Sequence, residues 1–184
     1  MIIIGITGTT GSGKGTLVNY LTSQKGFIHY SVRSFLIEEL TRRQFPVNRN
    51  TMTELANELR KNHSSSYIID CLFLQAQKTG KNAVIESLRA VGEIESLRKK
   101  GEFCLLAVDA SPDTRYKRII RRQSETDHVT FEEFVQNEQR EMFSSDPNKQ
   151  NLSQCIALAD HLLYNNGTID ELYTQLEKIL TGKY

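Results

Sequence analysis

The run of residues 7–16 constrains the fold of this chain more than any other stretch. Apart from Lys14, it contains only glycine, serine and threonine. The segment before it, residues 2–7, is apolar and β-branched, as in a buried strand, and the residues from Leu17 to Leu21 have the apolar spacing of a helix. Flexible residues between a strand and a helix indicate a loop whose backbone must adopt a specific shape.

The spacing Gly8-x-x-x-x-Gly13-Lys14 between a strand and a helix predicts a phosphate-binding P-loop. Glycines let successive amides turn inward around anionic oxygens, and the helix N-terminus adds partial positive charge. A plain strand-to-helix turn, the alternative, needs neither four glycines nor a lysine that can reach the outer phosphates. The expected nucleotide contacts are Gly8, Thr9, Thr10, Gly11, Ser12, Gly13, Lys14, Gly15 and Thr16.

One position departs from the usual loop. The residue after the lysine is normally Ser or Thr, whose hydroxyl binds Mg²⁺, but here it is Gly15. We therefore expect Mg²⁺ to be held by Thr16, by a carboxylate such as Glu86, or by the nucleotide and water alone.

Strand-like segments alternate with helix-like segments along the chain, which predicts a parallel α/β sheet with helices on both faces. Each strand-like segment is a short apolar run rich in β-branched residues, as expected for strands buried on both sides. These segments are residues 2–7, 27–32, 82–87, 103–109 and 161–166.

Four helix starts are marked by capping residues. A Ser or Thr followed three residues later by Glu satisfies free amides at a helix N-terminus, and Pro is favoured in the first turn. The expected caps are Thr51 with Glu54, Thr130 with Glu133, Thr168 with Glu171, and Ser111 before Pro112.

Length and composition fit one soluble cytoplasmic domain spanning residues 1–184. The net charge of +1 argues against a nucleic-acid partner, and the apolar runs are too short to span a membrane. The three cysteines are widely spaced and predict neither disulfides nor a zinc site. A monomer or a small homo-oligomer is expected. Residues 123–150 are polar and predict a helical, lid-like excursion.

Several segments resemble nucleoside monophosphate kinases such as adenylate kinase, and the related dephospho-CoA kinases. "GTTGSGKGT" (8–16) is similar to their P-loop, and "RYKRIIRR" (115–122) to the arginine helix that flanks their lid. "ADHLLYNNGTIDELYTQLEKIL" (159–180) looks like the C-terminal strand and helix of dephospho-CoA kinases. "VIESLRAVGEIESLRKKG" (84–101) is similar to a group of small archaeal proteins related to adenylate kinase.

The resemblance implies a three-layer P-loop NTPase fold with a five-stranded parallel sheet of order 2-3-1-4-5. It also implies ATP and Mg²⁺ as cofactors, with Asn166 at the nucleotide. Arg118 and Arg122 would clamp the transferring phosphates, with weaker expectations for Arg115 and Arg121. The alternative for this stripe is a solvated basic face.

Other charged residues are weaker candidates. Glu86, at the end of a strand, would hold Mg²⁺ or orient the acceptor, or else cap a helix. Arg89 stands near the position of an acceptor-binding arginine in the similar kinases. Arg33 at a helix start opposes the helix dipole unless an anion binds there. Arg140 would reach into the site from the lid. Arg60 would contact a ligand, or else would only interact favourably with the dipole at the end of its helix.

These observations predict a kinase that transfers the γ-phosphoryl group of ATP to a small nucleotide-like acceptor. A (deoxy)nucleoside monophosphate is the first candidate, and dephospho-CoA is the second. A nucleotide-sensing or regulatory ATPase without an acceptor is the alternative, supported by the missing hydroxyl at Gly15.

Overall fold

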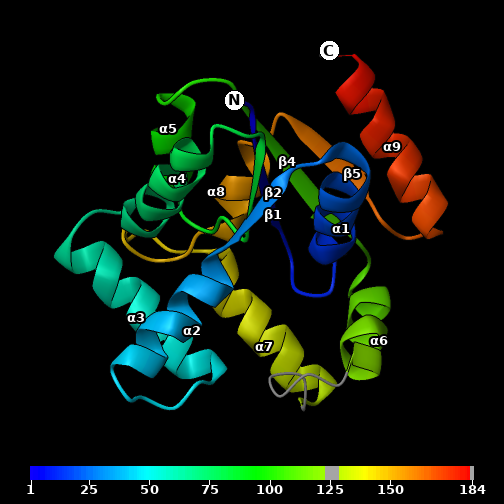
Figure 1. Cartoon of the computed structure of the whole chain (residues 1–184). Helices are drawn as coiled ribbons and strands as arrows, with labels where there is room; N and C mark the ends of the chain where they lie inside the picture. Colours follow the sequence, from blue (N-terminus) through cyan, green and yellow to red (C-terminus); the bar gives the residue numbers. More distant parts are fainter. Residues whose placement is uncertain (123–128, 183–184) are drawn as a thin grey trace.

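The computed structural model describes residues 1–122 and 129–182, and its centre is a five-stranded parallel sheet of order β2-β3-β1-β4-β5 (Figure 1). This is the predicted fold, and all five predicted strands are present. The carboxyl ends of β3, β1 and β4 meet at one edge, because Ile6 pairs with Glu86 and Gly8 with Val108. The strands are β1 Ile3–Gly8, β2 Ile28–Ser31, β3 Ala83–Glu86, β4 Phe103–Asp109 and β5 His161–Tyr164.

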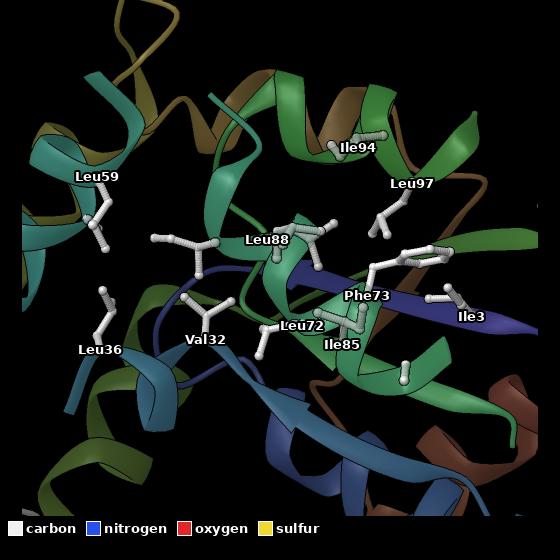
Figure 2. Packing of buried hydrophobic residues seen from close by; sticks show 14 of the residues in the cluster. Ile3, Val32, Leu36, Leu59, Leu72, Phe73, Ile85, Leu88, Ile94 and Leu97 are labelled. Carbon is white, nitrogen blue, oxygen red and sulfur yellow. The ribbon is translucent and has the colours of Figure 1, made fainter. Parts of the chain in front are cut away.

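Alternate residues of the central strands enter two separate cores. In β1, Ile3 packs on one face of the sheet, whereas Ile4 and Ile6 pack on the other. Figure 2 shows the first core, in which Ile3 and Ile85 lie near Phe73 and other apolar side chains. Both faces of a central strand are therefore buried, which explains its continuous apolar sequence.

Helices cover both faces of the sheet. The core on one face includes residues of α1 and α9, and the core on the other includes residues of α2, α3, α4, α5 and α8. Helices α2, α3, α6 and α7 gather near one end of the sheet (Figure 1). The bounds are α1 Lys14–Lys25, α2 Val32–Arg42, α3 Arg49–Asn62, α4 Tyr67–Thr79, α5 Val91–Arg98, α6 Pro112–Arg122, α7 Phe131–Met142, α8 Leu152–Ala157 and α9 Ile169–Thr181.

Three of the four predicted helix caps are confirmed. Thr130 and Thr168 each form a capping box with the glutamate three residues later. The Ser111 hydroxyl accepts a hydrogen bond from the Thr114 amide at 3.4 Å. The prediction for Thr51 with Glu54 is wrong, since α3 begins earlier.

Helix α3 begins at Arg49 because Asn48 is a better cap than Thr51. The Asn48 side chain accepts a hydrogen bond from the Thr51 amide at 3.0 Å, and the Thr51 hydroxyl lies 3.1 Å from the Asn48 amide that donates to it. Asn is among the preferred N-cap residues and leads Thr in that position. The earlier start places Arg49 in the first turn of α3.

The predicted excursion over residues 123–150 contains α7, followed by a segment that leads to α8. Part of that prediction, residues 123–128, lies outside the described residues. None of the described helices is both long enough and apolar enough to cross a membrane.

Candidate active site

The P-loop connects β1 directly to α1, and its shape depends on glycines with positive φ. Gly8 has a φ of 138° and Gly13 a φ of 112°, which L-residues with side chains rarely adopt. A Cβ at Gly8 would overlap the Val108 carbonyl oxygen, and one at Gly13 would overlap the Asn165 amide. The glycines are therefore required both by the backbone conformation and by the close approach of neighbouring segments.

Lys14 lies across the loop. Its Nζ donates hydrogen bonds to the carbonyl oxygens of Gly8 at 2.9 Å and Thr9 at 2.8 Å. Burial, together with the charge of Arg89 and a smaller effect of Arg122, lowers the pKa of Lys14 to about 7, although Glu86 and Glu141 act in the opposite direction. A phosphate beside Nζ would favour the charged ammonium form.

Gly15 and Thr16 occupy the first turn of α1. A Cβ built on Gly15 meets no atom within 4 Å, and its φ is not positive. Position 15 therefore has room for a hydroxyl that this chain lacks, while the partly buried Thr16 lines the neighbouring cavity.

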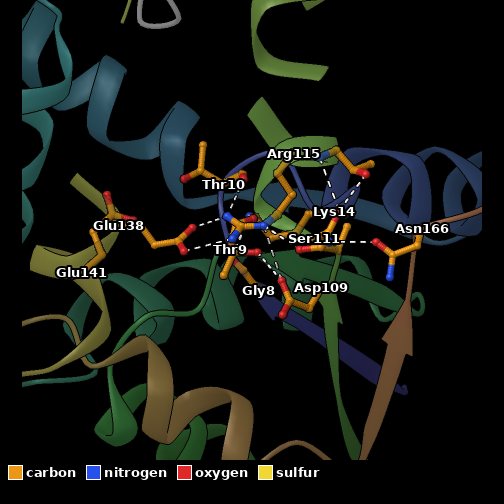
Figure 3. Close-up of polar contacts among 12 residues, drawn as sticks. Gly8, Thr9, Thr10, Lys14, Asp109, Ser111, Arg115, Glu138, Glu141 and Asn166 are labelled. Carbon is orange, nitrogen blue, oxygen red and sulfur yellow. Dashed lines mark hydrogen bonds and ion pairs between the residues drawn. The ribbon is translucent and has the colours of Figure 1, made fainter. Parts of the chain in front are cut away.

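Arg115 of α6 contacts the P-loop with its guanidinium group (Figure 3). It is only 3% exposed, and its Nε donates to the Ala110 carbonyl at 2.8 Å. Its Nη1 donates to the Thr10 carbonyl at 3.4 Å, and its guanidinium pairs with Glu138 of α7. Arg115 therefore connects the P-loop to α7, instead of facing a ligand with the rest of the arginine stripe.

Two further residues fix the loop. The Thr9 hydroxyl donates to Asp109 Oδ1 at 2.6 Å, at the end of β4. The Asn165 side chain donates to the Ser12 carbonyl at 2.8 Å and accepts from Arg118 Nη2 at 3.3 Å. Thr9 and Ser12 are both buried, and neither lines the cavity beside the loop.

A cavity of about 620 Å³ extends from the P-loop toward α2 and α3. Its volume is in the range of small-molecule sites. Seven cationic side chains and two carboxylates line it. One part, the P-loop half, is formed by Thr10, Gly11, Gly13, Lys14, Gly15 and Thr16, with Arg118 and Arg122 from α6. The other, the α3 half, is formed mainly by apolar residues of α2 and α3 and by Arg33, Arg49, Arg60 and Arg89.

Glu86 lies at the end of β3 and lines the cavity. Its Oε1 is 3.5 Å from His29 Nε2 and 3.5 Å from the Ser31 hydroxyl. Burial raises the pKa of Glu86, but His29, the charge of Lys14 and the Ser31 hydroxyl together lower it further, so the net pKa lies below its usual value. The carboxylate therefore stays charged at neutral pH.

The donor set fits Mg²⁺ held mainly by a nucleotide. Mg²⁺ takes oxygen ligands, keeps several waters, and often binds through one or two carboxylates together with substrate phosphates. The Glu86 carboxylate and the Thr16 hydroxyl line the same cavity and supply such oxygens. Within residues 1–122 and 129–182 there is no group of three or more His, Cys, Asp or Glu side chains that could hold a metal by themselves.

Glu141 joins three separate segments in the α3 half. Its Oε1 accepts from Arg49 Nη2 at 2.6 Å, and its Oε2 accepts from Arg89 Nη1. Arg89 Nη1 also donates to Gln150 Oε1 at 3.1 Å. This cluster holds the end of α7 against α3 and the segment after β3.

A buried ion pair lies beside this cluster. Arg60 and Glu93 are 2% and 1% exposed, and Arg60 Nη2 donates to Glu93 Oε1 at 2.8 Å. Glu93 Oε2 accepts from the amides of Arg89 and Ala90, so the pair fixes the backbone that carries Arg89. Arg60 Nη1 is buried and has no hydrogen-bond partner among the described residues.

Comparison with known proteins agrees with this geometry. A family model described as an AAA domain matches residues 4–143. A UPF0200 protein of Hyperthermus butylicus is 30% identical over 181 residues, which cover 98% of this chain and 94% of the relative. The chain belongs to the AAA domain family and to the UPF0200 proteins.

Solved structures share the fold of this UPF0200 protein. The crystal structure of TT1252 from Thermus thermophilus has a TM-score of 0.64 at 20% identity and covers 98% of this chain and 97% of its own. Shikimate kinase from Aquifex aeolicus has a TM-score of 0.58 at 13% identity, with 99% and 98% covered. The fold is thus that of small P-loop kinases, and the P-loop domain implies nucleotide binding.

Most of the predicted site residues of this UPF0200 protein come together in the cavity. These are the P-loop residues Thr10, Gly11, Gly13, Lys14, Gly15 and Thr16, together with Arg33, Glu86, Arg89, Arg118 and Arg122. The predicted contacts Gly8, Thr9 and Ser12 do not line it. Arg121 does not line the cavity and is exposed. Arg140 is also exposed and outside the lining, because the next residue of α7, Glu141, turns toward the cavity instead.

Asn166, a predicted nucleotide contact, does not line the cavity. It is exposed and accepts a hydrogen bond from the Ser111 amide at 2.7 Å, so it closes the start of α6. Asn165 is the residue that contacts the P-loop. Successive residues at the end of a strand point to opposite sides, so the two neighbouring asparagines take different roles.

Sequence reasoning missed Arg49 and Glu141 entirely. Both come from helices, and neither belongs to a recognisable motif. A partial signal for Arg49 is the spacing of Arg49, Met52, Ala56 and Arg60, which places these residues on one face of α3.

Proposed function

We propose that this protein transfers the γ-phosphoryl group of ATP to a small anionic acceptor. One observation carries the proposal: a single cavity joins the P-loop to a second, arginine-lined half. A protein that only binds a nucleotide needs the first half alone. A phosphotransferase must hold two molecules with their reacting atoms close together.

The P-loop half would hold the donor. The loop amides and Lys14 would bind the β- and γ-phosphates, and the ammonium would leave its two carbonyl partners for the phosphate oxygens. Mg²⁺, when bound through Glu86, Thr16 and water, would neutralise phosphate charge.

Arg118 and Arg122 would stabilise the transferring group. Both line the cavity from α6, and Arg118 Nη1 is buried without a hydrogen-bond partner among the described residues. An unsatisfied guanidinium nitrogen beside the P-loop suits an oxygen that gains charge in the transition state. Delocalised guanidinium groups match the charge spread over a phosphoryl group.

The α3 half would hold the acceptor. Val32, Leu36, Met52 and Ala56 provide an apolar wall, and arginines provide the charge. A molecule with a flat apolar body and an anionic group fits this combination, so a (deoxy)nucleoside monophosphate is the first candidate. Dephospho-CoA is the second.

The bonding changes differ between these acceptors. An acceptor oxygen attacks the γ-phosphorus, and the bond from that phosphorus to the β–γ bridging oxygen breaks to release ADP. A phosphate acceptor has no proton to lose at neutral pH. A hydroxyl acceptor must give up its proton, and Glu86, one of the two carboxylates that line the cavity, would take it.

A nucleotide-sensing ATPase is the rival function, and Gly15 favours it. Without a hydroxyl at that position the loop lacks its usual Mg²⁺ ligand. A sensor would hydrolyse ATP slowly, at a rate that small acceptors leave unchanged.

The test measures ADP formation with and without a panel of nucleoside monophosphates, deoxynucleoside monophosphates, dephospho-CoA and shikimate. We expect at least one compound to accelerate ADP formation about 10²-fold or more. In the same assay Arg118→Ala should slow the accelerated reaction, because Arg118 would stabilise the transferring group. The Arg121→Ala variant is the matched control, since both arginines are on α6 and only Arg118 lines the cavity. Equal rates with and without every compound would favour the sensor.

A further inference from the structure

The cluster around Glu141 has the form of an occupied anion site. Arg49 and Arg89 come from different segments and point their guanidinium groups at one carboxylate. Two guanidinium groups on the two oxygens of one carboxylate is also the arrangement by which arginines bind a ligand's carboxylate or phosphate. Glu141 itself lines the cavity, so its carboxylate lies where a ligand would enter.

The arginines keep this carboxylate charged. Burial raises the pKa of Glu141, but the charges and hydrogen bonds of Arg89 and Arg49 lower it further, to about 2. The site is therefore selective for a negative group, whether that group belongs to the protein or to a ligand.

The α3 half still has excess positive charge when Glu141 is in place. Arg60 is 2% exposed and lines the cavity, and Glu93 neutralises it on one side only, since its Nη1 lacks a hydrogen-bond partner among the described residues. Arg33 also lines this half. One carboxylate from α7 does not balance these cations.

We propose that Glu141 is an internal substitute for the anionic group of the acceptor. In the ligand-free protein it holds Arg49 and Arg89, and the oxyanion of the acceptor takes its place on the same two arginines. Displacement releases the C-terminal end of α7 from α3. The link to an acceptor rests on the proposed function, but the anion site and its internal competitor do not.

This arrangement has a measurable consequence for affinity. A site occupied most of the time by an internal group binds an external ligand more weakly, in proportion to the fraction of time it is free. Removing the charge of Glu141 should therefore strengthen anion binding. If Glu141 instead orients the arginines for the ligand, the same change should weaken it.

Calorimetric titration can show whether loss of the Glu141 charge strengthens or weakens anion binding. The protein is first saturated with a non-hydrolysable ATP analogue and Mg²⁺, so that the P-loop is filled, and inorganic phosphate or acetate is then added. We expect Glu141→Gln to raise the affinity for phosphate, acetate or both by about fivefold or more. The two anions distinguish a phosphate group from a carboxylate group on the acceptor.

Glu138→Gln is the matched control. Glu138 is one turn earlier on α7 and also pairs with an arginine, Arg115, but it does not line the cavity. An equal rise in anion affinity in both variants would mean that loosening α7 is sufficient, and it would overturn the proposal. Unchanged or weaker anion binding in Glu141→Gln would also overturn it.

Hydrogen exchange of the wild-type protein tests the same inference without a substitution. With the ATP analogue bound, phosphate should speed amide exchange in the last turn of α7, because the contact with Arg49 and Arg89 is lost. Slower or unchanged exchange there would contradict displacement. Neither measurement needs turnover, so failure here leaves the phosphotransferase proposal standing, and absence of transfer leaves this anion site standing.

Discussion

The two halves of the cavity obtain their positive potential in different ways. In the P-loop half much of it comes from one short stretch, residues 10–16, which carries Lys14 and the N-terminus of α1, with Arg118 and Arg122 added from α6. In the α3 half it comes from arginine side chains on separate segments, and a carboxylate from α7 already occupies two of them. The loop that forms most of the first half is continuous in sequence and is held by contacts with Asp109, Arg115 and Asn165, whereas the second half is assembled from side chains of separate segments.

The two halves should therefore respond differently to substitution. Gly8 and Gly13 have positive φ and no room for a Cβ, so a substitution at either position should disrupt the loop. The arginines of the α3 half depend on distant partners, so substitutions there should alter affinity for one ligand and leave the other site intact. Five variants or conditions separate these expectations.

The largest effect is expected for Lys14→Ala. Loss of the cation in the loop should reduce ATP turnover by at least about 10³-fold and weaken ATP binding, because the loop contains no other cationic side chain. Calorimetry with ATP analogue and a turnover assay would measure both. Wild-type affinity and turnover in this variant would disprove the assignment of the P-loop half.

Arg118→Ala should act on the transition state rather than on ATP binding. We expect kcat to fall on the order of 10³-fold, while the Kd for ATP changes little. Arg118→Lys should recover little activity, since an ammonium lacks the planar two-pronged contact. Parallel losses in kcat and in ATP affinity would make Arg118 a binding residue only.

Arg89→Ala should affect the α3 half alone. Hydrogen bonds to charged groups contribute about 1.5–3 kcal/mol, so KM for the acceptor should rise roughly 10- to 100-fold with the Kd for ATP unchanged. Arg42→Ala is the control, because Arg42 is exposed on α2 and pairs with Glu39. A matching loss of ATP affinity in Arg89→Ala would show that the two halves are not separable.

The pH dependence of stability should reveal the buried charge of Lys14. Its pKa is about 7 in the folded protein and 10.5 in the unfolded chain, so the unfolded chain binds more protons between these values. The free energy of unfolding of the wild type should therefore rise with pH across this window, relative to that of Lys14→Met. Urea denaturation from pH 6.5 to 9.5 would measure the difference, which should be largest near pH 7 and shrink as the pH rises. A difference in unfolding free energy that stays constant with pH would show that burial does not disfavour the charged form of Lys14.

Gly15→Ser should have the smallest effect. The position has room for a side chain, and replacing a helical glycine stabilises by roughly 0.5–1 kcal/mol at most. The new hydroxyl should tighten Mg²⁺ binding in the nucleotide complex by a few-fold. A large loss of stability would contradict the open space seen at this position.

The fold and the P-loop were predictable because their signals are local. Runs of apolar β-branched residues marked the strands, and contiguous glycines marked the loop. The cap of α3 was misplaced because Asn48, which is not followed by Glu or Gln at the third position, outcompetes Thr51. Asn165 and Asn166 could not be distinguished, since the side to which each points depends on how β5 ends.

The α3 half was only partly predictable. Arg33 and Arg89 were candidates from sequence, but Arg49 and Glu141 come from α3 and α7 and form their ion pair only in the folded protein. Arg115 looked like one member of a ligand-facing stripe. Burial beneath the loop and its pairing with Glu138 give it a structural role that helical spacing alone does not reveal.

The most direct test of the two-half account follows a labelled γ-phosphoryl group. ATP carrying the label is incubated with Mg²⁺, the protein and the compound that most accelerates ADP formation, and the products are separated. The account predicts that the label appears on that compound in the wild type and that this transfer is strongly reduced in Arg89→Ala. Label found only in inorganic phosphate, in the same amount with and without the compound, would contradict it.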